Sequence, residues 1–69
     1  MTFGEVVQLY IDEQGITQSE LARRMGCARQ TVSSVCEEGR RAPRLDTAMA
    51  IADALGVSLQ EMVDRMAES

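Results

Sequence analysis

The 69-residue chain has room for one domain with a small hydrophobic core, so we expect residues 1–69 to form a single domain without a catalytic cleft between domains. Hydrophobic residues make up 45% of the chain but include one Phe, one Tyr and no Trp, and their pattern shows no strand-like alternation, which favours a compact all-α bundle. The sequence shows no leader-like segment and no apolar run near the roughly 20 residues of a membrane helix, so we expect a cytoplasmic protein with no membrane partner. The net charge of −4 excludes a uniformly basic surface.

Five helices are predicted from apolar side chains that recur every three or four residues and from the breaks between these segments. The helices cover about residues 2–14, 18–25, 28–38, 45–55 and 59–66. The connections are short, and GRRAPR, residues 39–44, is expected to be an irregular loop because Pro43 suits the boundary between two helices. We therefore expect a compact five-helix bundle.

Three of the helix starts carry a capping box, in which a hydroxyl residue precedes a glutamate by three positions, together with apolar residues placed to form a hydrophobic staple. The pairs are Thr2 with Glu5, Thr17 with Glu20, and Ser58 with Glu61. Glycines in a left-handed conformation are expected to end the first four helices. They are Gly15, Gly26, Gly39 and Gly56.

Helical spacing also predicts which side chains of the first, fourth and fifth helices are buried. They are Val6, Leu9 and Tyr10; Leu45, Ala48, Ile51, Ala52 and Leu55; and Leu59, Met62, Val63 and Met66. The methionines are expected to fill gaps in this core.

Residues 17–35 predict a helix-turn-helix motif, because two short amphipathic helices flank the glycine turn at Gly26. The second of these helices has only Val32 and Val35 as a narrow buried seam. Polar side chains occupy the rest of it, including Arg29, Gln30, Thr31, Ser33 and Ser34. Arginine can bond guanine and glutamine can bond adenine in bidentate fashion, so this helix is expected to be displayed to a DNA major groove. An ordinary solvent-facing helix is the alternative.

The charge distribution supports a local DNA-binding face despite the acidic total. Between Arg23 and Arg44 the chain holds six arginines and two acids, a local charge of +4. The arginines are Arg23, Arg24, Arg29, Arg40, Arg41 and Arg44, and the acids are Glu37 and Glu38. Glu20 is spaced to pair with Arg23 or Arg24, so neither is included in the predicted site. The alternative is that these arginines lie on an ordinary solvent-exposed face and bind no DNA.

The two cysteines, Cys27 and Cys36, are expected to be reduced, small hydrophobic side chains. Their spacing matches no metal or redox motif, and the chain contains no histidine. We therefore expect no metal, no cofactor, no small-molecule ligand and no enzymatic activity.

Residues 16 to about 63 resemble the repressor and Cro group of bacterial and phage regulators, the XRE-type or Cro/C1-type helix-turn-helix proteins with a lambda-repressor-like fold. The matching residues are Thr17-Gln18, Leu21-Ala22, Gly26, Arg29 to Ser33, and Ile51-Ala52 followed by Leu55 to Ser58. The resemblance implies that Gln18 contacts a phosphate and supports the recognition helix. It also implies base contacts from positions matching Arg29, Gln30 and Ser34, with Thr31 and Ser33 near the DNA backbone or the groove floor. Phosphate contacts from the following loop would involve Arg40, Arg41 and Arg44.

The chain departs from the family pattern at three places. Ala28 stands where a serine commonly caps the recognition helix, which is expected to weaken that helix start by a few tenths to about 1 kcal/mol. Cys36 replaces a usual glutamate, and the stretch to Pro43 is one residue longer, which leaves the direction of the loop arginines open. Arg44 occupies another cap position, where it cannot cap but could reach a phosphate.

These patterns predict a sequence-specific DNA-binding transcriptional regulator, expected to be a repressor that binds as a homodimer. Twofold pairing would place two recognition helices about 34 Å apart on one face of the duplex. The predicted outward side of the fourth helix, with Met49, Ala50 and Ala54, is a candidate dimer surface, to which the fifth helix could contribute. An antitoxin that also binds a partner protein, and a protein-interaction module of the same fold, are the alternatives.

Overall fold

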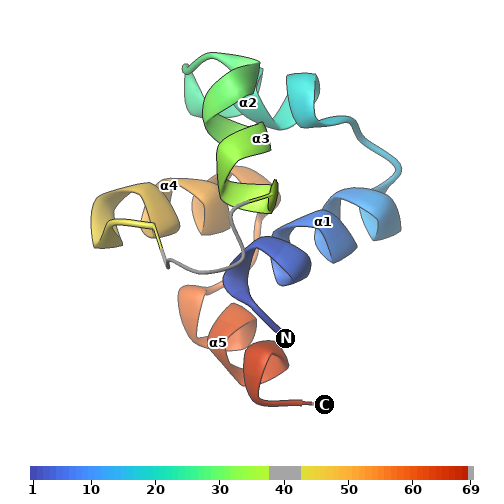
Figure 1. Ribbon diagram of the computed structural model, residues 1–69, viewed down its shortest axis with the longest axis vertical. Helices are drawn as coiled ribbons and strands as arrows, with labels where there is room; N and C mark the ends of the chain where they lie inside the picture. Colours follow the sequence, from blue (N-terminus) through green and yellow to red (C-terminus); the bar gives the residue numbers. More distant parts are fainter. Residues whose placement is uncertain (38–42, 69) are drawn as a thin grey trace.

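The fold contains five α-helices, as the sequence predicts, in a computed structural model that describes residues 1–37 and 43–68. The helices are α1 (Phe3–Gln14), α2 (Gln18–Met25), α3 (Arg29–Glu37), α4 (Leu45–Leu55) and α5 (Leu59–Ala67). Figure 1 shows α2 and α3 together at one end of the molecule, α1 and α4 on either side, and α5 at the other end near both chain termini. The terminal ammonium of Met1 donates to the Met66 carbonyl at 3.1 Å, which ties the two ends together.

A single apolar core lies where α1, α2, α4 and α5 meet beneath α3. Its fully buried larger side chains are Val6, Val7, Ile11, Leu21, Val32, Ile51 and Met62. On α1, Val6 and Tyr10 are buried as predicted, but Leu9 is only half-buried, and Phe3, Val7 and Ile11 are buried in addition. The reason is that α1 packs against α3, α4 and α5 at once, which buries more than one helical stripe.

Two predicted core residues, Leu45 and Val63, are exposed instead, with 67% and 46% of their surface open to solvent. Both line a shallow apolar depression that also involves Phe3, Pro43 and Met66. Helical spacing identifies an apolar stripe but cannot tell how far along it a neighbouring helix extends. Within the described residues, no element covers Leu45 at the start of α4 or Val63 in the middle of α5.

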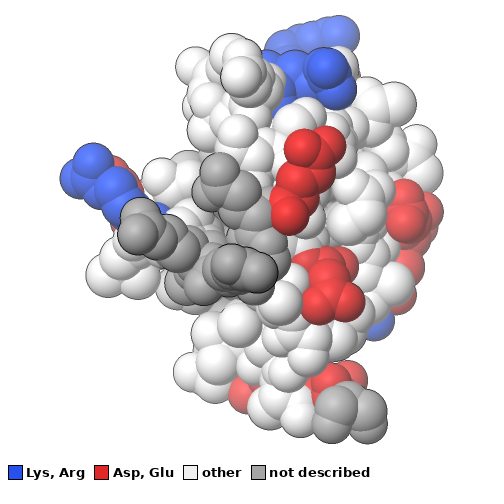
Figure 2. Space-filling view, viewed as in Figure 1, with Lys and Arg blue, Asp and Glu red and all other residues white. Residues whose placement is uncertain are grey.

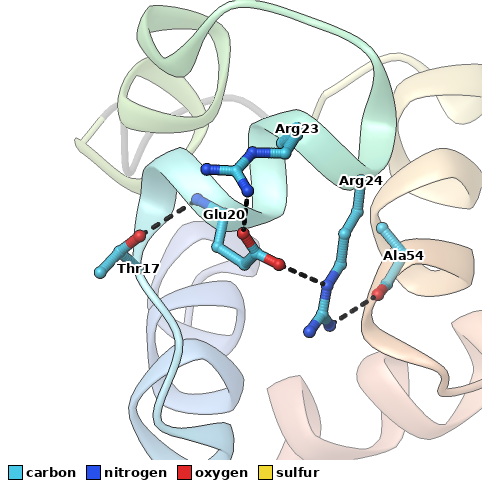
Figure 3. A network of polar contacts seen from close by, with 5 residues as sticks. All are labelled: Thr17, Glu20, Arg23, Arg24 and Ala54. Carbon is cyan, nitrogen blue, oxygen red and sulfur yellow. Dashed lines mark hydrogen bonds and ion pairs between the residues drawn. The ribbon is translucent and has the colours of Figure 1, made fainter.

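The predicted helix starts at Thr2, Thr17 and Ser58 are confirmed as N-caps, since each hydroxyl accepts the backbone N–H three residues later at 3.1 Å. Only Thr2 completes a reciprocal capping box, in which the Glu5 carboxylate accepts the Thr2 N–H at 3.0 Å. The Glu20 carboxylate instead pairs with Arg23 and Arg24 of its own helix (Figure 3). The Glu61 carboxylate accepts from the Tyr10 hydroxyl of α1.

The glycines that follow α1, α2 and α4 adopt the predicted left-handed conformation, with φ between 67° and 74°. At each of these turns, the residue after the glycine donates its N–H to a carbonyl five residues earlier, as Cys27 does to Ala22 at 3.0 Å. The apolar side chain at that position then packs against the core. Gly39, the fourth predicted helix end, lies outside the described residues.

Candidate nucleic-acid interface

The recognition-helix candidate, α3, is held between α1 and α2 by its narrow apolar seam. Val32 is fully buried, and Val35 and Cys36 are partly buried against the core. The helix begins without a side-chain cap at Ala28, and its first turn is closed by the Thr31 N–H, which donates to the Ala28 carbonyl at 3.0 Å. The missing serine therefore leaves a helix start that relies on backbone contacts alone.

The opposite side of α3 is open to solvent, as the sequence predicts. Arg29, Gln30 and Thr31 are exposed in its first turn, and Glu37 is exposed at its end. Ser34 is half-buried. These exposed side chains, together with Ser34, form what we call the outer face of α3. Their amide, hydroxyl and guanidinium groups can donate to or accept from base edges.

Ser33 differs from the expected outward orientation, because it is half-buried and its hydroxyl donates to Gln18 Oε1 at 2.7 Å. This hydrogen bond joins Gln18, which belongs to the Thr17-Gln18 pair that matches the family, to the recognition-helix candidate. Gln18, the first residue of α2, thus supports α3 as the resemblance implied. Arg29 Nη1 in turn donates to Ser33 Oγ at 3.4 Å.

Two residues of α1 that the sequence did not single out continue this contact. Gln18 Nε2 donates to Gln8 Oε1 at 3.0 Å, and Gln8 Nε2 donates to Asp12 Oδ1 at 3.0 Å. Their polar side chains, four residues apart and so on one face of the helix, were the available sequence signal. The spacing alone does not show which other helix they face.

A glycine sets how closely α1 approaches the end of α3. Gly4 is buried, and a Cβ atom added there would overlap the carbonyl oxygen of Val35 and lie 2.9 Å from the carbonyl oxygen of Cys36. The absent side chain therefore allows the backbones to meet. Gly4 was not among the residues predicted to be important, although a glycine inside a capped helix start is a signal of close packing.

The arginines of the predicted basic segment that the structure describes make separate contacts in different parts of the molecule. Arg23 and Arg24 lie 3.3 and 3.6 Å from the Glu20 carboxylate, as expected, and Arg24 also donates to the Ala54 carbonyl at 3.4 Å (Figure 3). Arg44 lies 3.6 Å from Asp46 and is highly exposed at the start of α4. Its side chain makes no cap hydrogen bond, as predicted.

Figure 2 shows basic side chains at the α2 and α3 end of the molecule and at the start of α4, and separate acidic patches over the middle, right and lower parts of the visible face. Arg40 and Arg41, two of the predicted phosphate contacts, lie outside the described residues. So does Glu38.

Both cysteines are free and half-buried. Burial raises the pKa of the Cys36 thiol, and the nearby Glu37 and Asp12 carboxylates act in the same direction, while a hydrogen bond with Gln18 opposes them. This environment favours the unreactive thiol over the thiolate. Among residues 1–37 and 43–68, no group of three or more potential metal-ligating side chains comes together.

None of the described helices has the length and apolar character needed to cross a bilayer.

Comparison with known families gives a match to the family described as helix-turn-helix over residues 7–62. An uncharacterized HTH-type transcriptional regulator, y4dJ of Sinorhizobium fredii, is 47% identical over 51 residues, which are 74% of this chain and 65% of that protein. Another, from Methanothermobacter thermautotrophicus, is 52% identical over 44 residues, which are 64% of this chain and 62% of that protein. The match thus spans slightly under two thirds of the length of either relative.

Two crystal structures share the arrangement of helices. The clp gene regulator ClgR from C. glutamicum superposes with a TM-score of 0.84 at 22% identity, over 94% of this chain and 83% of that one. The restriction-modification controller protein C.AhdI from Aeromonas hydrophila gives 0.78 at 28% identity, over 87% and 89%. HTH-type transcriptional regulators are a non-enzymatic class, in agreement with the expected lack of catalysis. The chain belongs to the helix-turn-helix family, of the repressor and Cro type that its residues resemble.

Proposed function

We propose that this protein is a sequence-specific DNA-binding regulator of transcription that inserts α3 into the major groove. The observation that carries the proposal is the outer face of α3, which is open to solvent while Val32 and the Ser33–Gln18 hydrogen bond hold the opposite side. A helix presented in this way fits the groove and offers polar groups at its N-terminal turn, where helix-turn-helix proteins contact bases. The cytoplasm is the corresponding location.

Within this proposal, Arg29 and Gln30 contact base edges in the groove, with Ser34 one turn further along the helix. Thr31 and Ser33 lie near the DNA backbone or the groove floor. Gln18 contributes a phosphate contact through the second N–H of its Nε2, because its Oε1 accepts from Ser33 and the other N–H is donated to Gln8. Arg44 supplies a second phosphate contact, because its exposed guanidinium pairs, among residues 1–37 and 43–68, with the exposed carboxylate of Asp46 alone, and this solvent-screened pair is easily released.

Arg40 and Arg41 are proposed as further phosphate contacts on the basis of their charge and of their place in the chain between α3 and α4. Together with Arg29 and Arg44 they would concentrate positive charge beside α3 in a protein of net charge −4. Such local concentration is what phosphate binding requires, and it makes affinity depend on salt. The acidic remainder would disfavour loose binding elsewhere on the surface.

We further propose that the protein acts as a repressor and binds as a homodimer. One short helix buries little surface, and a twofold pair would present two recognition helices about 34 Å apart along the duplex. Met49 and Ala50, on the outer side of α4, are exposed and are available for such a contact, with Met49 56% exposed. Ala54, the third predicted residue there, is only half-exposed.

Selection of binding sites from random duplexes, followed by affinity measurements on single variants, tests the proposal. Gln30→Ala should weaken binding to the selected duplex by about 1–3 kcal/mol and relax the preference at one base pair. Arg44→Ala should weaken selected and random duplexes alike and lower the slope of log affinity against log salt by about one. Gln60→Ala, an exposed glutamine on α5, is the matched control and should change neither value.

Equal losses on selected and random DNA for Gln30→Ala would contradict its assignment to a base contact. A selection that yields no preferred sequence would refute the proposed function. Retention of the fold with no DNA binding in moderate salt would instead favour a protein-interaction module.

A further inference from the structure

A chain of side-chain hydrogen bonds runs from α3 across α2 to α1 and links, in order, Arg29, Ser33, Gln18, Gln8 and Asp12. Each link donates in the same direction, from the Arg29 guanidinium toward the Asp12 carboxylate. The four donor–acceptor distances are 3.4, 2.7, 3.0 and 3.0 Å, in that order. The cation is therefore at the donor end and the anion at the acceptor end.

This direction follows from the chemistry of the two ends. A guanidinium has only donors and an ionised carboxylate has only acceptors, whereas hydroxyls and amides can serve as either. Because Asp12 accepts from Gln8 Nε2, the carbonyl oxygen of Gln8 is left to accept from Gln18. Gln18 must then present its own oxygen to Ser33, whose hydroxyl proton is directed inward.

The hydrogen-bond chain reaches the outer face of α3 through Ser33 Oγ, which accepts from Arg29. With its proton directed to Gln18, this oxygen presents lone pairs to Arg29, which donates to it along the helix. If both glutamine amides turned over, Gln18 and Arg29 would both donate to the same oxygen, and the Ser33 proton would point away. Asp12 favours the first arrangement, because an inverted Gln8 would place its oxygen against the carboxylate.

We propose that Asp12 is a positioning residue for DNA recognition: it acts through Gln8, Gln18 and Ser33 to orient Arg29 before DNA binds. A guanidinium that is already held loses less freedom when it meets a base, so the preference at that base pair is sharper. The inference rests on the proposed function. It adds a residue of α1, outside the two helices of the motif, to the determinants of sequence preference.

The chain offers a matched control for Asp12 on α5. Gln60 Nε2 donates to Asp64 Oδ1 at 2.9 Å, again four residues apart on an exposed helix surface. Asp12→Ala and Asp64→Ala remove the same charge and the same kind of local pair. Only Asp12 is connected to Ser33, so the difference between the two variants isolates the hydrogen-bond chain.

The experiment measures fluorescence anisotropy of the selected duplex and of a random duplex of equal length, in the same salt, for each variant. Asp12→Ala should lower the ratio of the two affinities by about three- to tenfold, with the lost preference confined to the base pair that Arg29→Ala also relaxes. Asp64→Ala should leave this ratio within about twofold of the wild type. Thermal midpoints of the two variants should agree within about 3 °C, which separates positioning from stability.

A double-mutant cycle with Ser33→Ala provides the second readout. If Asp12 acts through the chain, Asp12→Ala should have no further effect on the affinity ratio once Ser33 is replaced. Equal ratios for Asp12→Ala and Asp64→Ala would overturn the inference, as would a full Asp12→Ala effect in the Ser33→Ala background. A wild-type protein without any sequence preference would refute the proposed function, and the inference with it.

Discussion

Replacement of Gly4 by alanine tests the contact that fixes α1 against the end of α3. Gly4 is the second residue of α1 and is buried. An added Cβ would overlap the carbonyl oxygen of Val35 and approach that of Cys36 to 2.9 Å. Both obstacles are backbone atoms, so a change of rotamer cannot relieve the overlap and one helix must shift.

The expected magnitude is the difference between two opposing effects. Alanine in place of glycine stabilises a helix by about 0.5–1 kcal/mol when space is available. Overpacking in a tightly packed interior costs about 1–3 kcal/mol. Because Gly4 meets backbone on the facing helix, we expect the second effect to exceed the first and destabilise the protein by about 1–2 kcal/mol. For a domain of this size, that corresponds to a midpoint lowered by roughly 5–15 °C.

Thermal unfolding followed by circular dichroism, with urea unfolding as a second measurement, gives the free-energy difference. Ser19→Ala is the matched control, because Ser19 is the second residue of α2 and is exposed. Its midpoint should stay within about 3 °C of the wild type, since an exposed substitution there changes the free energy of unfolding by less than about 0.5 kcal/mol. A Gly4→Ala midpoint equal to or above the wild-type value would refute the reasoning, because it would mean that α1 and α3 are not in close backbone contact.

Three further outcomes are expected. Ala28→Ser should supply the missing cap of α3 and stabilise the protein by a few tenths to about 1 kcal/mol in urea unfolding, and an unchanged midpoint would show that the backbone already satisfies this helix start. The hydrogen bond from Arg65 lowers the pKa of Glu13 below 4.5, so its stabilising contribution is present above that pH and is lost as pH falls through the lowered value. Thermal midpoints should therefore decline less steeply from pH 5 to pH 3 in Glu13→Gln than in the wild type, and parallel curves would contradict the assignment. In a Cys27→Ala background, Cys36 should react with a disulfide reagent at pH 8 more slowly in the folded protein than in urea, because burial raises the pKa of its thiol; equal rates would show that the thiol is open to solvent.

Local sequence patterns determined where the helices begin and end. The capping residues form hydrogen bonds with backbone groups only a few positions away in the chain. They are the hydroxyl residues Thr2, Thr17 and Ser58 and the glycines Gly15 and Gly26. Such effects depend on little beyond the neighbouring chain, so they could be predicted from the sequence. The exposed first turn of α3 could also be predicted, because the inward positions of Val32 and Val35 imply the direction of the opposite face.

Only the tertiary structure decided which residues of different helices meet. The sequence contained Gly4, Gln8 and Asp12, but nothing in the spacing of α1 showed that its glycine would face the carbonyls of α3 or that its glutamine would reach Gln18. It likewise could not show that the apolar stripe of α4 would extend past its neighbours and leave Leu45 exposed. Helix periodicity specifies a direction around one axis, whereas contacts between helices depend on how several axes are placed relative to one another, which the whole core determines together.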